Sequence, residues 1–154
     1  MQKFISKNIT EDNGPLQFAL TDLDGNVKYC LKIGSSGMLK ARFNIVNSND
    51  EVIATFESRR SMLEKIKMPF VKVKCANGIK FTAHKDIENL YYMVILTGHE
   101  LCLDGDVYSD EYLIGHKDKY ICIVHPDPDE TIVEIDEDEE ELAAIAYFAT
   151  SVAR

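Results

Sequence analysis

Six basic residues between positions 59 and 74 are the strongest candidates for a functional site. They are Arg59, Arg60, Lys65, Lys67, Lys72 and Lys74. Cations attract phosphate and carboxylate groups, and each one near an anionic membrane contributes about 1 kcal/mol, an attraction that salt weakens. Lys72 and Lys74 are two residues apart, so their side chains lie on one face of a strand. We therefore treat the six residues as a candidate anion-binding site for an anionic lipid or another anionic ligand.

The residues that usually carry catalysis or bind metals do not show the required spacing. No two of the histidines at 84, 99, 116 and 125 are three or four residues apart, as helical metal ligands are. His116 and His125 flank a predicted hairpin and could approach each other in space. No serine lies in a G-x-S-x-G sequence, and residues 34–37 lack the lysine of a phosphate-binding loop. We predict no catalytic residue, no metal site and no cofactor, and a protein that is not an enzyme.

The charges are distributed unevenly along the chain. The net charge of −9 argues against general affinity for nucleic acid. Residues 28–85 contain twelve Lys and Arg against four Asp and Glu, whereas residues 104–141 contain fifteen Asp and Glu against two Lys. These two regions could attract each other within the fold. Alternatively, the basic region binds an anionic partner, or the acidic region from Asp127 to Glu141 binds a basic protein.

Alternating apolar and polar residues predict a series of β-hairpins. Residues 16–20 and 27–33 flank Asp24-Gly25, and residues 71–75 and 79–83 flank Asn77-Gly78, dipeptides that favour tight turns. A third hairpin joins residues 43–45 to 52–56. Further strands are predicted at residues 91–96, 101–103, 112–114, 120–124 and 131–135, the first of them covered on both faces. The prediction is ten to twelve strands within residues 16–136, after a short polar lead.

The last segment predicts a buried helix over residues 138–153. Residues 142–153 are apolar on every side, which is typical of an enclosed helix, and they are too few to cross a membrane. Asp138 and Glu141 have the spacing of a capping box at its start. A closed barrel of about twelve strands has a bore that a helix can fill. We therefore predict a mainly β fold, a single domain over residues 1–154, with a closed antiparallel barrel around the helix.

The cysteines and the first residues bear on the location of the protein. Cys30, Cys75, Cys102 and Cys122 are far apart and include no C-x-x-C pair. Met1-Gln2-Lys3-Phe4 leads into polar sequence rather than into the apolar core of a signal peptide. We predict reduced thiols, a cytoplasmic protein and no transmembrane segment.

The layout of these elements also carries a resemblance to a known family. It lies in the hairpins Phe18–Asp24-Gly25–Ile33 and Phe43–Asp50–Phe56, in Gly105-Asp106 before Tyr112-Leu113-Ile114, and in the terminal Ala-rich helix. This arrangement, over residues 16–153, resembles the tubby C-terminal-like superfamily, in particular the LURP-one-related proteins and their small bacterial relatives. Phospholipid scramblases are more distantly similar. The resemblance implies a twelve-stranded barrel around a hydrophobic C-terminal helix.

The functional implications of the resemblance are narrower. Tubby-type domains bind phosphoinositide headgroups through surface Lys and Arg residues, but no headgroup motif is matched here residue by residue. Scramblases carry a calcium-binding acidic segment near their final helix. Residues 136–141 occupy a similar place but lack the glycine and the alternating ligands of a calcium loop. The main prediction is a non-enzymatic binding module with a basic site, and the alternative is a protein-interaction or structural module with an acidic site.

Overall fold

The computed structural model describes residues 1–10, 16–36, 40–59, 70–85 and 93–154. The described chain forms twelve strands, one short 3₁₀ helix and one α-helix. The strands are β1 (Gln2–Thr10), β2 (Leu16–Thr21), β3 (Val27–Ser36), β4 (Lys40–Asn47), β5 (Val52–Arg59), β6 (Phe70–Cys75), β7 (Lys80–Lys85), β8 (Val94–Thr97), β9 (Leu101–Asp106), β10 (Glu111–His116), β11 (Lys119–Asp127) and β12 (Glu130–Ile135). The helices are η1 (Glu137–Glu139) and α1 (Glu140–Ala153).

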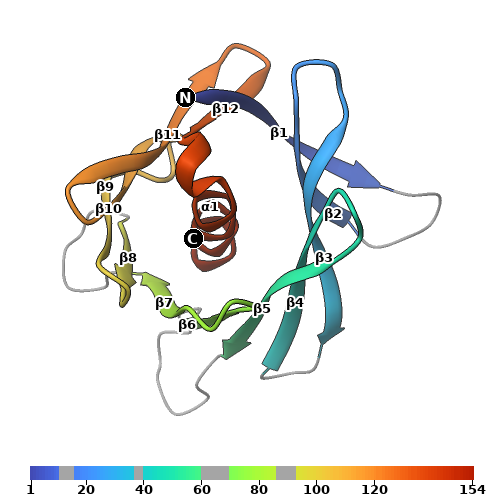
Figure 1. Ribbon diagram of the computed structural model, residues 1–154, viewed down its shortest axis with the longest axis vertical. Helices are drawn as coiled ribbons and strands as arrows, with labels where there is room; N and C mark the ends of the chain where they lie inside the picture. The colour runs from blue at the N-terminus through green and yellow to red at the C-terminus, as the bar shows by residue number, and fades with distance from the viewer. Residues whose placement is uncertain (11–15, 37–39, 60–69, 86–92) are drawn as a thin grey trace.

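The strands form one antiparallel sheet that curls into a nearly closed barrel (Figure 1). Their order is β8-β7-β6-β5-β4-β3-β2-β1-β12-β11-β10-β9, so almost every strand pairs with its neighbour in the sequence. In addition to its neighbour β2, β1 pairs with β12, which places Gln2 opposite Ile135. β8 and β9 are the two ends of the order, and no ladder joins them within the described residues. The predicted mainly β, twelve-stranded barrel is confirmed, and its closure is complete except between β8 and β9.

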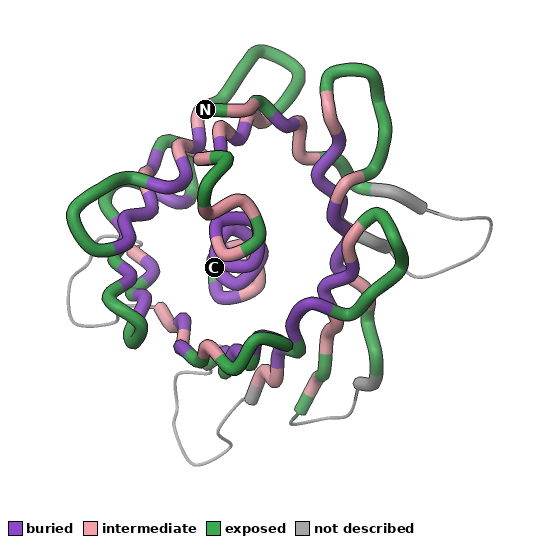
Figure 2. The backbone as a smooth tube through the Cα atoms, in the orientation of Figure 1, coloured by how far each residue is buried: buried purple, intermediate pink, exposed green. Residues whose placement is uncertain are grey.

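The C-terminal helix lies inside the ring of strands (Figure 1). Nine residues of α1 are buried, and Figure 2 shows buried residues both along the helix and along the wall that surrounds it. The inner wall supplies large apolar side chains from several strands, among them Phe4, Ile45, Phe56 and Ile121. A helix that is apolar on every side can bury all of its surface only in such an enclosure. The predicted central helix is therefore confirmed.

The start of the helix differs from the predicted capping box. The chain first makes the 3₁₀ turn η1, whose N-cap is Asp136, and the Asp136 side chain accepts a hydrogen bond from the Asp138 backbone N–H at 3.1 Å. The α-helix begins two residues after Asp138, and its N-cap, Glu139, makes no side-chain capping bond. The prediction was wrong because the 3₁₀ turn takes the first acidic residues out of the α-helical spacing.

The first strand was missed, so the predicted strand region of residues 16–136 begins too late. β1 is part of the barrel wall: Phe4 is fully buried and pairs with Val133 on β12. Two residues further along β1, Ser6 is half-buried and accepts a hydrogen bond from the Tyr147 hydroxyl at 2.8 Å. A hydroxyl at this position interrupts the apolar alternation that normally identifies a strand. Residues 2–10 therefore form part of the barrel wall.

The strand predicted at residues 91–96 is also corrected. β8 covers Val94–Thr97, and residues 91 and 92 lie outside the described chain. Val94 and Leu96 are buried, whereas Ile95 and Thr97 are exposed. The strand therefore has one covered face rather than two. The run of apolar residues was misleading because Ile95 is an exposed apolar residue on the outer face.

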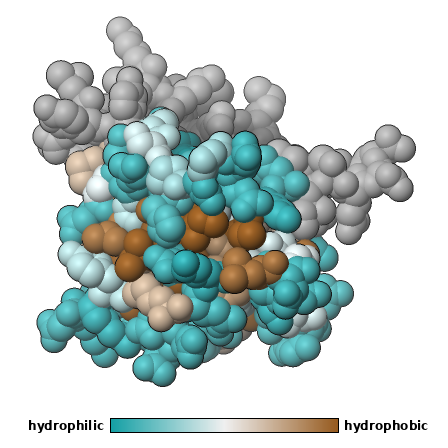
Figure 3. Space-filling model, turned by 90° about the horizontal axis from the view of Figure 1, so that it is seen from above, coloured by the Kyte–Doolittle hydropathy of each residue, from teal (hydrophilic) through white to brown (hydrophobic). Residues whose placement is uncertain are grey.

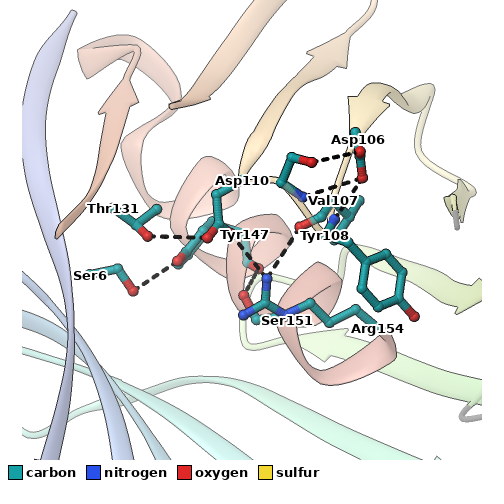
Figure 4. Close-up of polar contacts among 10 residues, drawn as sticks. Ser6, Asp106, Val107, Tyr108, Asp110, Thr131, Tyr147, Ser151 and Arg154 are labelled. Carbon is teal, nitrogen blue, oxygen red and sulfur yellow. Dashed lines mark hydrogen bonds and ion pairs between the residues drawn. The ribbon is translucent and has the colours of Figure 1, made fainter. Parts of the chain in front are cut away.

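Polar contacts at the C-terminal end of α1 attach the helix to the wall (Figure 4). Arg154 Nη1 donates to the Val107 carbonyl at 3.2 Å and lies 3.0 Å from Asp110 Oδ1. The other oxygen of Asp110 accepts a hydrogen bond from the Thr131 hydroxyl at 3.4 Å. These contacts join the helix end to the turn between β9 and β10 and to β12. The helix position is thus fixed by polar groups as well as by apolar packing.

The outer surface is mainly polar but not uniformly so. Figure 3 shows one face, on which hydrophilic side chains surround a group of hydrophobic ones. Several large apolar residues elsewhere on the outer side of the strands are also exposed, among them Phe70 and Ile95. Charge is therefore not the only chemical feature that distinguishes one part of the surface from another.

Candidate functional site

The described chain includes the side chains of two of the six predicted basic residues. Lys72 and Lys74 are exposed on β6. Arg59 is the last residue of β5, where its backbone lies opposite Phe70, but its side chain is not described. Arg60, Lys65 and Lys67 lie outside the described residues. The structure therefore describes the β6 part of the predicted site.

The two lysines point outward because β6 alternates strictly. Val71, Val73 and Cys75 are buried, while Phe70, Lys72 and Lys74 are exposed. The buried positions pack on the helix side of the wall, so the period of two places the charged positions in solvent. The predicted single face for Lys72 and Lys74 is confirmed.

The adjacent strand β7 adds a third cation that sequence reasoning missed. Lys80 lies directly opposite Lys74, and Thr82 lies directly opposite Lys72. Cross-strand neighbours have Cβ atoms about 5 Å apart, and like charges in that position destabilise a sheet. The hairpin across Asn77-Gly78 was predicted, and the register of that hairpin could have identified Lys80. Cys75 N–H donates to the Ile79 carbonyl at 2.8 Å, and this pairing places Lys80 opposite Lys74.

The lysines line a hollow in the outer face of the barrel. The hollow has a volume of about 940 Å³ and is formed by β4 to β8. Its hydroxyl groups come from threonines on three different strands, Thr55, Thr82 and Thr97. Its charged residues are Arg42, Glu57, Lys72, Lys74 and Lys80. Four cations and one carboxylate, together with hydroxyl donors, suit an anion better than a cation.

Glu57, the carboxylate that lines the hollow, forms ion pairs with Lys40 and Arg42 rather than with the three lysines. Glu57 Oε1 lies 3.3 Å from Lys40 Nζ, and Glu57 Oε2 lies 3.7 Å from Arg42 Nη2. Lys72, Lys74 and Lys80 form no ion pair with any described residue, although Glu57 lies opposite Lys72 in the ladder. We refer to Lys72, Lys74 and Lys80 as the lysine cluster.

The acidic region does not neutralise the lysine cluster in the described structure. β6 and β12 are six positions apart in the twelve-strand order, which places them on opposite sides of the barrel. The acidic residues near β12 pair locally: Asp136 Oδ2 lies 2.7 Å from Lys119 Nζ, and Glu134 Oε2 lies 3.3 Å from His125 Nε2. The hydrogen bond from Lys119 lowers the pKa of the Asp136 carboxyl below its usual range.

His116 and His99 lie together, whereas His125 lies elsewhere. His116 is buried at the mouth where α1 begins, and its Nδ1 lies 2.6 Å from Glu139 Oε1. The His99 ring stacks on it with a centroid separation of 4.8 Å. His125 instead contacts Glu134 and does not approach His116 as an ion-pair or ring partner in the described chain. Among the described residues, no group of three or more His, Cys, Asp or Glu could hold a metal ion.

Comparison with known proteins adds no family assignment. No protein-family model, curated protein or solved structure matches this chain. Within the described residues, no helix is both long and apolar enough to span a bilayer.

Proposed function

We propose that the protein is a non-enzymatic binding module that holds an anionic ligand in the hollow of β4 to β8. The observation that carries this proposal is the lysine cluster: three cations converge on one hollow, two of them directly opposite each other, without an acidic partner in the described structure. Surfaces that concentrate like charges pay a repulsive cost, which a bound anion removes. An anionic lipid headgroup and a soluble phosphate compound share the required chemistry.

The net negative charge of the protein does not exclude this function. β12 and its acidic residues lie across the barrel from β6, and exposed charges separated by more than about 10 Å are largely screened at 0.1 M salt. The four cysteines are free, which is consistent with a reducing compartment. We accordingly propose a cytoplasmic protein. The barrel around a terminal helix is the architecture that the tubby-like resemblance implies, and membership of that superfamily remains a proposal.

The test compares two triple variants with the same change in net charge. In the first, Lys72→Gln, Lys74→Gln and Lys80→Gln remove the lysine cluster. In the second, the control, Lys3→Gln, Lys7→Gln and Lys117→Gln remove three exposed lysines elsewhere. The probes are inorganic tripolyphosphate, measured by calorimetry, and vesicles of phosphatidylcholine with or without phosphatidylserine, measured by sedimentation.

We expect the parent protein to bind an anionic probe at low salt and to release it at high salt. At about 1 kcal/mol per cation, loss of the cluster should weaken binding roughly a hundredfold. The control variant should bind like the parent protein. No binding of either probe at low salt, or equal loss in both variants, would reject the proposal.

A second candidate function is supported by the acidic residues between Asp127 and Glu141. Six acidic residues in the region from Asp127 to Glu141 are exposed and form no ion pair with a described residue. They are Asp127, Asp129, Glu130, Glu137, Asp138 and Glu141. These carboxylates suit a basic protein partner. A pull-down from source lysate with these six residues changed to Asn or Gln should lose that partner, whereas the lysine-cluster variant should retain it.

A further inference from the structure

The outer face of β6 and β7 changes its chemistry stepwise along the two strands. Three cross-strand pairs succeed one another: Phe70 with His84, Lys72 with Thr82, and Lys74 with Lys80. The first pair is aromatic, the second combines a cation with a hydroxyl, and the third is doubly cationic. The paired strands therefore have an aromatic end and an anion-attracting end on the same exposed face.

The aromatic end is a platform that is partly exposed to solvent, with Phe70 exposed and His84 half-buried. The Phe70 and His84 rings stack with a centroid separation of 5.8 Å and an angle of 29° between their planes, and Phe70 is 37% exposed. On the other side of His84, the pairing places Ile95 of β8, which is also 37% exposed. Aromatic faces stack with other planar rings, and base–aromatic stacking contributes about 1–3 kcal/mol.

The distance between the two ends fits one class of ligand. Outward positions on a strand are two residues apart, and each residue advances the chain by about 3.3 Å. Phe70 and Lys74 are therefore about 13 Å apart along the strand. An extended nucleoside triphosphate separates its base from its terminal phosphates by a comparable length. Lys72 and Thr82 lie between the ends, where the sugar and first phosphate of such a ligand would lie.

We propose that β6 and β7 bind a phosphorylated ligand that carries a planar aromatic ring, of the nucleoside polyphosphate class. The ring stacks on Phe70 and His84, and the terminal phosphates lie between Lys74 and Lys80. This orientation relieves the repulsion of the two opposed lysines and covers the exposed aromatic platform with one molecule. The inference rests on the proposed anion binding and adds a requirement for the aromatic end.

The test distinguishes the contribution of the aromatic ring to binding from that of the phosphates. Adenosine triphosphate and inorganic tripolyphosphate are titrated by calorimetry into the full-length parent protein and into three variants. Phe70→Leu keeps an apolar side chain but removes the aromatic face, and Lys74→Gln with Lys80→Gln removes the cationic pair. The control, Tyr120→Leu, removes an aromatic ring that is 48% exposed on β11. Circular dichroism and urea unfolding confirm that each variant is folded.

We expect the parent protein to bind the nucleotide more tightly than tripolyphosphate. Phe70→Leu should weaken nucleotide binding roughly fivefold to a hundredfold, as loss of one stacked base implies, and leave tripolyphosphate binding unchanged. The double lysine variant should weaken both, and Tyr120→Leu should change neither.

Two outcomes overturn the inference while the proposed function stands. One is equal affinity for the nucleotide and tripolyphosphate, with no effect of Phe70→Leu on either. The other is binding of phosphatidylserine vesicles that Phe70→Leu abolishes, without binding of the nucleotide, which assigns the aromatic end to a membrane surface. If no anionic probe binds, the proposed function and the inference both fall.

Discussion

His116 is a buried polar side chain at the barrel mouth where α1 begins. It is 4% exposed, and its Nδ1 lies 2.6 Å from Glu139 Oε1, while its Nε2 has no hydrogen-bond partner among the described residues. The contact links β10 to the turn that precedes α1. Removing one member of a buried polar pair leaves the other without a partner, which costs about 1–3 kcal/mol.

The contribution of the His116–Glu139 contact to stability can be tested by comparing His116 with His125. We expect His116→Ala to lower the free energy of unfolding in urea by about 1–3 kcal/mol. His125 also contacts a carboxylate, Glu134, but it is 43% exposed, so His125→Ala should cost less than about 1 kcal/mol. Similar costs for the two variants would show that the His116–Glu139 contact does not contribute to stability through its burial.

At the scale of single residues, the sequence predicted only part of the site. The exposure of Lys72 and Lys74 followed from alternation along one strand. Lys80 was missed because it is a neighbour of Lys74 across two strands rather than along one, and such neighbours depend on the register of the hairpin. The three threonines of the hollow come from β5, β7 and β8, and only the curvature of the sheet brings them together. No spacing within one segment encodes such a set.

Among the strand elements, the hairpin of β9 and β10 depends on Gly105. This residue has a φ of +117° and lies opposite Tyr112. A Cβ atom there would lie 2.5 Å from the Glu111 carbonyl oxygen and 2.7 Å from Tyr112 Cα, both backbone atoms of the paired strand. A side chain at this position therefore meets a steric clash in addition to the backbone strain of a positive φ.

The clash predicts that replacing Gly105 with alanine destabilises the protein more than replacing Gly25 does. Gly25 has a φ of +87°, but a Cβ atom there would have nothing within 4 Å. We expect Gly25→Ala to cost about 1 kcal/mol from backbone strain alone. Gly105→Ala should cost at least about 2 kcal/mol because overpacking adds to the strain. Urea unfolding of both variants provides the measurement, and equal costs would contradict the close approach of β9 to β10.

The elements that were predicted well are those with a strong local pattern. The three hairpins and the terminal helix have clear periods and turn residues. β1 was missed because Ser6, which binds Tyr147 of the helix, replaces an inward apolar residue. The start of α1 was misplaced because a 3₁₀ turn precedes it. Both errors occur where the chain makes a specific polar contact, which periodicity does not detect.

For the whole molecule, the pKa shifts define the pH range of stability. Asp22, Asp106 and Asp136 have lowered pKa values, caused first by hydrogen bonds from Asn26, Ser109 and Lys119 respectively. A lowered pKa in the folded state gives stability that is present above the ordinary value and is lost on acidification. Asp106 is exposed, and Asp22 and Asp136 are only half-buried, so we expect only a shallow loss of stability below about pH 4.

The alkaline limit should be steeper because its groups are buried. Burial, assisted by nearby Glu141, raises the pKa of the Cys75 thiol to about 11, and burial also raises the pKa values of Cys122, Tyr29, Tyr112 and Tyr147. Each of these groups stays neutral in the folded state, whereas the unfolded state ionises at the ordinary pKa, so stability falls as pH rises past that value. We expect the urea midpoint to fall steeply above about pH 9. A midpoint that is constant from neutral to strongly alkaline pH would contradict this burial.

At the same scale, the architecture was predictable because an enclosed helix and a dozen strands admit few arrangements. The distribution of charge around the barrel was less predictable than the architecture. The sequence showed a basic region and an acidic region, but the placement of β6 and β12 on opposite sides of the barrel depends on the strand order, in which these two strands are half a circuit apart. That separation is what leaves the lysine cluster available to an external anion.

The pairing of β1 with β12 also determines when this protein can fold. Residues 2–6 find their partners at residues 131–135, and the helix that fills the barrel follows still later. During synthesis, the growing chain can form its successive hairpins but cannot complete the wall until residues 131–135 have left the ribosome. Until then the apolar inner face is uncovered, so the nascent chain is exposed to aggregation and is a natural client for chaperones.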